Sequence, residues 1–306
     1  MTFTLTTMTD AIKQLQPNKA IIFADSVLND WNEVPATAEY AELTYISSDA
    51  AWKAYSAIDF SSTTTVTMVG KKVKVIDLMS EAGFSKRELE KTWMGNNTSF
   101  LLGRGMEPYQ RVITETIIEP LTESRVQKMF VGVSGTTSPN GIVVQLKADS
   151  DRVTDTSYSG TNGYTGFTYA TAITVVDSLI GFIPEKMTKN KTLKLYMSIT
   201  HFKQFIQKVR DSAGRYYAPD VYGENSLRFK YAFGGAEVEI VGTHALYGTN
   251  YMFIAPADRL YNIYRATDVN ETMDFWYDIN SKQYRTRVEN SFVPSYAHAS
   301  EIVCNF

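Results

Sequence analysis

The most constraining feature of the sequence is a long stretch, from Tyr40 to Leu78, that has the pattern of extended strands but no continuous apolar face. Thr63 to Val69 is dense in β-branched residues, and Gly70-Lys71 has the character of a turn. After it, Val73 and Val75 alternate with lysines. A two-stranded hairpin that is polar on both sides buries too little surface to be stable alone. The stretch therefore predicts an extended hairpin that is completed by contacts outside its own domain.

The first 39 residues also lack the means to form a core. Their apolar residues form two short groups, around Ile22 and Leu28, with Trp31 at the end, and a helical turn before them stops at Pro17. Groups of this size cannot enclose a hydrophobic interior. We expect an N-terminal arm whose apolar side chains pack on something else.

The middle of the chain predicts one long helix and two loops. Apolar residues recur at helical spacing from Pro108 to Gly132, and Pro120 is expected to kink this helix because proline removes a backbone hydrogen bond. A glycine-rich loop follows over residues 131–142, and residues 148–167 have the polar, glycine-rich composition of a second loop.

The second half alternates between helical and strand patterns, which predicts an α+β fold. We expect a helix up to Ile183 that is capped by Thr168, a half-buried strand from Leu193 to Ile199, and an amphipathic helix from Thr200 to Gly214. Further strands are predicted around residues 237–241, 251–255, 260–264, 273–279 and 284–289.

Length and charge narrow the class of protein. A chain of 306 residues has room for about two domains. Its net charge of −3 disfavours a self-sufficient nucleic-acid binder, because no basic excess is present to neutralise phosphates. The single cysteine, Cys304, cannot form an internal disulfide, which fits a reducing compartment. No signal-peptide or membrane-span pattern is present, so we expect a soluble protein without a membrane partner.

Aromatic residues are abundant and leave two interpretations open. The chain has 19 Tyr, 16 Phe and 4 Trp, which is 13% of its residues. Tyrosine packs through its ring and keeps a solvated hydroxyl, so such a chain could cover a large protein–protein interface. An ordinary core that happens to use aromatic residues is the alternative.

Motifs that carry chemistry are missing from the sequence. His201, His244 and His298 are scattered, and no pair has metal-ligand spacing. Ser134 lies in a loop that does not match a nucleophile motif, and Asp274 and Asp278 fit a solvated strand face. We expect no catalytic, metal or cofactor site, although catalytic residues dispersed along a chain leave no such signature.

The order of these parts resembles the major capsid proteins of tailed bacteriophages, which have the Hong Kong 97-type capsid fold. The likeness rests on the order of four stretches rather than on a strict motif. They are residues 57–92, with A-I-D-F and S-K-R-E-L-E-K-T; residues 130–142, F-V-G-V-S-G-T-T-S-P-N-G-I; residues 193–217, with the strand, the helix and D-S-A-G-R-Y-Y; and residues 233–241, 251–255 and 285–297, which are similar to the closing strands.

The resemblance implies a division of the chain into named parts. It predicts an N-terminal arm (1–39), an extended E-loop hairpin (40–82), a peripheral P-domain with a long spine helix (83–146), an axial A-domain with a sheet and flanking helices (147–270), and closing strands of the P-domain with the C-terminus (271–306).

The function implied by this family is structural. The chain would assemble with copies of itself into hexamers and pentamers of an icosahedral shell around double-stranded DNA, which it would contact weakly and without sequence preference. Separate scaffolding, portal and decoration proteins are possible partners, and the shell would be assembled in the cytoplasm of a bacterial host. Three alternatives stay open: an encapsulin-like compartment that encloses an enzyme, a tail or baseplate protein, and an α+β hydrolase with dispersed catalytic residues.

Subunit contacts are expected in the arm, the hairpin and the closing strands. No core of a single subunit is evident there to receive the aromatic residues, and the charged residues are candidates for pairs between subunits. The predicted interface residues are Trp31, Tyr40, Tyr45, Trp52, Tyr55, Lys71, Lys72, Arg285 and Arg287.

Overall fold

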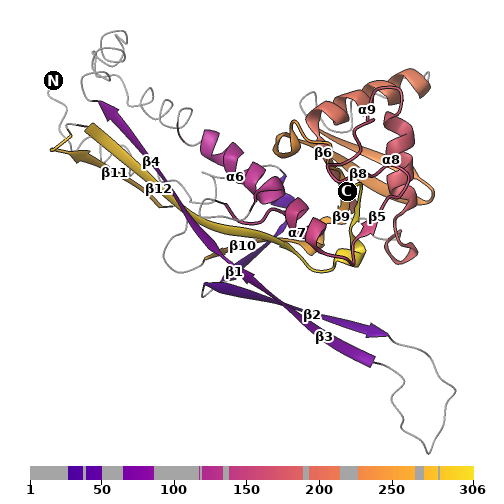
Figure 1. The fold of residues 1–306 in the computed structure, drawn as a ribbon, viewed down its shortest axis with the longest axis horizontal. Coiled ribbons are helices and arrows are strands. Elements are labelled where there is room, and N and C mark those ends of the chain that lie inside the picture. The colour runs from indigo at the N-terminus through magenta and orange to yellow at the C-terminus, as the bar shows by residue number, and fades with distance from the viewer. Residues whose placement is uncertain are drawn as a thin grey trace, which may run out of the picture.

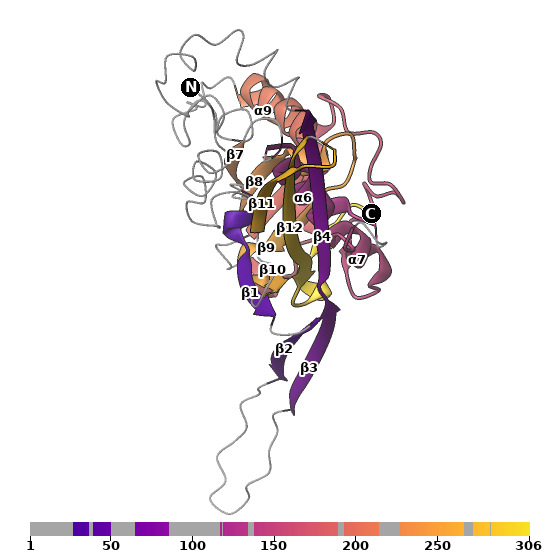
Figure 2. The same ribbon diagram turned by 90° about the vertical axis from the view of Figure 1, so that its left-hand side faces the viewer.

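Two β-sheets built from distant parts of the chain form the body, and a two-stranded hairpin projects from it (Figures 1 and 2). The computed structural model describes residues 27–36, 39–49, 65–85, 117, 119–133, 138–188, 193–213, 227–265, 272–281 and 283–306. Within this part of the chain, no helix is both long and apolar enough to cross a membrane.

The first sheet is organised by its longest strand, β12 (Gln283–Tyr296). Over residues 283–292, β12 pairs antiparallel with β4 (Ile76–Ser85), and it also pairs in succession with β11 (Thr272–Asp278) and β10 (Leu260–Arg265). The N-terminal strand β1 (Asn32–Ala36) adds to β10 in parallel and completes five strands.

The second sheet has six strands in the order β5-β13-β9-β6-β8-β7. Their bounds are β5 Val153–Thr154, β13 Val303–Cys304, β9 Phe253–Pro256, β6 Leu193–Ser198, β8 Ala236–Thr243 and β7 Arg228–Phe233. One face packs against α8 (Ala172–Gly181) and α9 (Ile199–Ala213) through a core that includes Val176, Leu195 and Phe205. The combination of sheets and helices confirms the predicted α+β class.

Strand β6 is buried on both sides, and the prediction of a half-buried strand is wrong. Leu195 and Met197 face the core beneath α8 and α9, whereas Tyr196 lies in the core on the opposite face of the sheet. Tyr196 is fully buried because helices cover this side as well. The alternating side chains of β6 therefore point into two different cores, and neither face of the strand is turned to solvent.

The predicted amphipathic helix is confirmed over residues 200–213 as α9, and its predicted end at Gly214 lies outside the described residues. The preceding helix begins later than expected. Helix α8 starts at Ala172 and not directly after Thr168. The hydroxyl of Thr171 accepts a hydrogen bond from the backbone N–H of Thr168 at 3.0 Å and donates one to the carbonyl of Gly166 at 2.8 Å. This local network holds residues 166–171 in a turn, which delays the helix.

The two remaining helices pack against the other face of the six-stranded sheet. Helix α6 (Glu119–Val131) contains Pro120, and Ile117, three residues before this proline, is in a π-helical turn. The predicted start at Pro108 lies outside the described residues. Helix α7 (Ile142–Ala148) was not predicted and follows the glycine-rich loop directly.

Glycine is required where this loop returns to α6. The N–H of Gly141 donates to the carbonyl of Gly132 at 2.8 Å, and a Cβ atom at Gly141 would lie 2.5 Å from the carbonyl oxygen of Phe130. A side chain here would separate α7 from α6.

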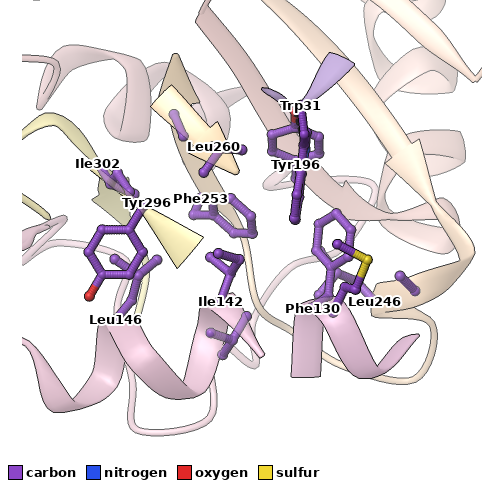
Figure 3. Close-up of a cluster of buried hydrophobic side chains, with 14 of the residues drawn as sticks. Trp31, Phe130, Ile142, Leu146, Tyr196, Leu246, Phe253, Leu260, Tyr296 and Ile302 are labelled. Atoms are coloured by element: carbon purple, nitrogen blue, oxygen red, sulfur yellow. Dashed lines mark hydrogen bonds between the residues drawn. The ribbon is translucent and has the colours of Figure 1, made fainter. Parts of the chain in front are cut away.

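The core between the two sheets contains Trp31, and the expectation that no core of the same subunit receives this residue is wrong. Trp31 is 4% exposed, its ring lies 5.3 Å from that of Phe130, and its indole N–H donates to the hydroxyl of Tyr196 at 3.2 Å (Figure 3). Val27 and Leu28 are buried in the same cluster. The end of the predicted arm is therefore part of the body.

The central position of Phe130 leads to a stability prediction. Phe130 is fully buried and contacts the rings of Trp31, Tyr196 and Phe253. Phe130→Ala should lower the free energy of unfolding by about 3–5 kcal/mol, because it leaves a cavity where several elements meet. Chemical denaturation followed by circular dichroism measures this. Val133→Ala, at a position 70% exposed, should change it by less than about 0.5 kcal/mol.

Burial of His201 leads to a pH prediction. His201 stacks on Phe167 with ring centroids 4.4 Å apart, and burial lowers its pKa below the usual 6.5. The pKa of His201 is therefore lower in the folded chain than in the unfolded chain. Because of this difference, the free energy of unfolding has its full value above about pH 6.5 and falls as the pH drops through the folded pKa. His201→Asn should weaken the loss of thermal stability between pH 7 and pH 5. An unchanged loss would contradict the prediction, and His244→Asn, at an exposed position, is the matched control.

Candidate functional site

The hairpin has two ten-residue strands, β2 (Tyr40–Asp49) and β3 (Thr65–Lys74), paired along their full length. At about 3.3 Å per residue it extends roughly 33 Å. It forms a sheet of its own and points away from both larger sheets (Figures 1 and 2). The predicted hairpin is confirmed, but the prediction of a turn at Gly70-Lys71 is wrong, because both residues lie within β3 and pair with Thr44 and Leu43 of β2. The hairpin ends at Lys74, because the chain from Ile76 onwards pairs with β12.

A small core fixes the root of the hairpin. It joins side chains of β2, β3 and the following residue to the five-stranded sheet. Its members are Ala36, Ala41, Leu43, Val73, Val75, Ile263 and Val293. The N–H of Val75 also donates to the carbonyl of Glu39 at 2.9 Å. Among the described residues, the hairpin is thus attached to the body at this end, where the core and its hydrogen bonds hold it.

The outer side of the root carries solvent-exposed charges. Lys74 pairs with Glu39 at 2.7 Å, and the hydrogen bond from Lys74 lowers the pKa of Glu39. The ammonium group of Lys72 lies 4.7 Å from the ring centre of Tyr40, which is 44% exposed. Two predicted interface residues, Tyr40 and Lys72, therefore lie together on an accessible surface.

Lys71 lies on the inner side of the root and contacts the body. Its ammonium group is 3.5 Å from the ring centre of Tyr296 and donates to the side-chain carbonyl of Gln145 at 3.4 Å. The hydroxyl of Tyr296 donates in turn to Asp149 at 2.9 Å. Burial lowers the pKa of Lys71 to about 8, although the charge of Asp149 opposes this shift.

Arg285 and Arg287 lie far from the hairpin root. They occupy the opposite end of β12, about 30 Å along the strand from Tyr296. Arg285 pairs with Asp278 at 3.0 Å, and Arg287 pairs with Glu289. The structure therefore gives both arginines ion pairs within their own chain.

Three predicted interface residues have no described side-chain position. Tyr45 lies in β2, but only its backbone is described, and Trp52 and Tyr55 lie outside the described residues. Their role at an interface stays a prediction.

A cavity of about 200 Å³ between α6 and the five-stranded sheet was not predicted. Its lining comes from three separate segments: Leu78, Met79 and Ser80; Leu121, Ser124, Arg125 and Lys128; and Val288, Asn290 and Phe292. No local pattern in the sequence links these segments. Among the residues that the structure describes, no group of three or more His, Cys, Asp or Glu side chains is arranged to hold a metal ion.

The environment of Lys71 can be tested by titration. We expect its amine to titrate near pH 8, below the usual 10.5, because the docked position is poorly solvated. The charged form of Lys71 is disfavoured only while its amine lies against Tyr296. The hairpin root with this contact formed therefore becomes more stable as the pH rises from about 8 to 10.5. NMR of ¹³C-dimethylated lysines measures the pKa, and Lys71→Arg assigns the signal. Asp149→Asn should lower this pKa further, and titration of Lys71 together with the bulk of lysines would contradict the expectation.

Comparison with known proteins adds information at the level of fold. No protein-family model and no curated protein matches the sequence. Solved structures match nearly the whole chain. The procapsid of satellite phage P4 with its size determination (Sid) protein is 10% identical with a TM-score of 0.57, covering 100% of this chain and 91% of the other. The capsid of a native GTA particle is 12% identical with a TM-score of 0.56, covering 91% and 88%.

A virus-like particle from Pyrococcus furiosus is similar to the same extent. It is 10% identical with a TM-score of 0.53, covering 98% of this chain and 96% of the other. Identities of this size establish a likeness of fold. The α+β architecture of these structures extends here over nearly the whole chain. The chain therefore has the Hong Kong 97-type capsid fold that the sequence resemblance implied.

Proposed function

We propose that the chain is a major capsid protein of a tailed bacteriophage, which assembles with copies of itself into hexamers and pentamers of an icosahedral shell around double-stranded DNA. The observation that carries this proposal is the projecting hairpin, whose described contacts with the body lie at its root, on a fold shared with capsids. Such a subunit would be a component of the virion and would be assembled in the cytoplasm of a bacterial host.

The physical argument concerns unpaired strand edges. Strands β2 and β3 pair with each other and with no other described strand, so each has a free edge ten residues long. Long free edges readily pair with or dock on another chain. A neighbouring copy that receives the hairpin would bury surface that one subunit leaves in water.

The proposed contacts between subunits lie on the hairpin and its outer root. Tyr40 and Lys72 are accessible there, and Tyr45, Trp52 and Tyr55 belong to the hairpin or its connection. Trp31 is not among the proposed contacts, because it is buried inside its own subunit. Lys71 contributes indirectly, because its contact with Tyr296 positions the root of the hairpin. Separate scaffolding, portal and decoration proteins are further proposed partners.

The charge of the chain supports weak contact with packaged DNA. A net charge of −3 supplies no basic excess for binding phosphates, so tight and salt-sensitive DNA binding is not expected. A container needs this property, because a cargo bound tightly to every subunit could not be packed or released.

A compartment that encloses an enzyme is the second candidate. It is supported by the likeness to the Pyrococcus furiosus particle, which covers 98% of this chain. The content of purified particles distinguishes the two functions: double-stranded DNA favours the phage capsid, and a co-purified cargo enzyme favours an encapsulin-like compartment.

The proposal predicts that the purified chain forms closed shells or capsomers in electron micrographs. Replacing residues 45–69 with a two-residue Asn-Gly turn keeps the root core and removes the outer hairpin. This variant should still fold, as shown by a cooperative thermal unfolding transition, but fail to close shells, since its contacts with neighbours are lost.

The matched control is Glu42→Gln, which changes one exposed charge on the hairpin and should still assemble. Small particles without a shell from the unmodified chain would contradict the proposal. Normal shells from the shortened variant would show that the hairpin is not required for assembly.

A further inference from the structure

The cavity between α6 and the five-stranded sheet has a largely apolar floor (Figure 1). Val288 and Phe292 of β12 line it and are buried, and the register of the sheet places Leu78 of β4 opposite Asn290, which lies between them in β12. Met79 also lines the cavity and is 56% exposed, so apolar surface extends from the cavity to the outside of the protein. A bound apolar group would cover this floor and remove it from water.

The opposite wall is one face of α6, and it carries two positive charges. The lining residues of this helix are spaced at i, i+3, i+4 and i+7, which places them on one side of it. They are Leu121, Ser124, Arg125 and Lys128. Arg125 is only 8% exposed, and its guanidinium lies 5.4 Å from the ring centre of Phe292. A cation is thus held against the apolar floor rather than in open solvent.

The charges of the lining favour an anion. Among the described residues that line the cavity, two are cationic and none is acidic, and the other polar ones are neutral: Ser80, Ser124 and Asn290. A cation attracts an anion more strongly in a poorly solvated site than at an open surface. A guanidinium has five N–H donors, so Arg125 can bind a carboxylate and keep other acceptors at the same time. The wall of α6 therefore suits one carboxylate, and the floor suits an apolar group.

The size of the cavity indicates which molecule fits. A cavity of about 150 Å³ holds a benzene molecule, so one of about 200 Å³ has room for roughly eight to ten non-hydrogen atoms. An aspartate or glutamate side chain of another protein is smaller, and it has no apolar end to cover Leu78 and Val288. A free carboxylic acid with a short hydrocarbon chain has both the charge and the apolar end.

We propose that this cavity binds a small amphiphilic monocarboxylic acid, whose carboxylate lies at Arg125 and Lys128 and whose hydrocarbon chain covers Leu78 and Val288. The bound acid contacts α6, β4 and β12 together, so it stabilises the packing of the helix on the sheet. The site lies within a single chain. The proposal therefore goes beyond the function proposed above and does not depend on the formation of shells.

Equilibrium dialysis of the purified full chain against radiolabelled octanoate at pH 7 tests the proposal. We expect one site per chain with a dissociation constant on the order of 0.1 mM. Butanoate should bind on the order of 100-fold more weakly, because its shorter chain leaves the floor uncovered. Octanamide has the same length without the charge and should bind at least about 10-fold more weakly. Equal binding of octanoate and octanamide, or no saturable binding of octanoate, would overturn the proposal.

Substitutions in the lining separate the effect of charge from that of space. Lys128→Gln removes one charge and should weaken octanoate binding at least about 10-fold, whereas Lys128→Arg keeps the charge and should bind within about 3-fold of the unmodified chain. Ser124→Phe keeps both cations but fills the cavity, so it should abolish binding. Lys186→Gln removes an exposed lysine outside the cavity and is the matched control. Unchanged binding in Lys128→Gln, or in a folded Ser124→Phe variant, would overturn the proposal.

A photoreactive probe locates the site without any substitution. Octanoic acid that carries a diazirine in its hydrocarbon chain loses N₂ on irradiation and bonds to the residues beside it. Mass spectrometry should find the label on peptides that contain residues 78–80, 121–128 or 288–292, and an excess of octanoate should remove it. Label in the core beneath α8 and α9, or label that octanoate does not displace, would overturn the proposal. Shells and separate subunits are both suitable for this measurement, so its result is independent of the proposed function.

Discussion

The packing of four aromatic rings between the two large sheets holds the body together. Phe130 from α6, Tyr196 from β6, Phe253 from β9 and Trp31 lie within 6.4 Å of one another in successive ring contacts (Figure 3). Each ring comes from a different segment, so the cluster forms only when all four segments are in place. It buries the side of the six-stranded sheet that α8 and α9 do not cover, and it brings the N-terminal residues into the body. Val27 and Leu28 lie in the same buried cluster, and so does Tyr296, which contacts Lys71 at the hairpin root.

The hairpin shows the opposite arrangement. Its root is held by a small core and by the contact of Lys71 with Tyr296, while the rest of β2 and β3 has no partner among the described strands. A domain that only had to be stable would not extend two ten-residue strands into water, because ordering them costs conformational entropy that little burial offsets. The strands are explained if burial occurs between subunits. The structure thus separates one part that is closely packed internally from another whose strands pair only with each other among the described strands.

Local periodicity predicted those elements that have one buried side. Helix α9 has apolar residues at helical spacing because one face covers the sheet and the other faces water, and the pattern in the sequence reports this difference directly. The hairpin was predictable on another ground, because its β-branched residues indicate strands and the lack of a continuous apolar face indicates that they do not belong to a core of their own. The prediction failed at β6, where both sides are buried, and at Trp31, whose partners come from distant segments. The candidate site was predicted as a hairpin with interface residues, but the separation of Lys71 and Tyr40 onto opposite sides of its root was not.

The sequence by itself determined the α+β class, the extended hairpin and the order of parts that resembles capsid proteins, because these follow from patterns within short stretches of chain. Only the tertiary structure decided that the end of the arm belongs to the body, that Arg285 and Arg287 pair within their own chain, and that Asp30 pairs with Lys194 and Arg228 of the six-stranded sheet. These features join residues that are 2 to more than 160 positions apart, at geometries set by the packing of whole sheets. The free energy of such contacts depends on distance and burial, which are properties of the folded chain and not of any segment of its sequence.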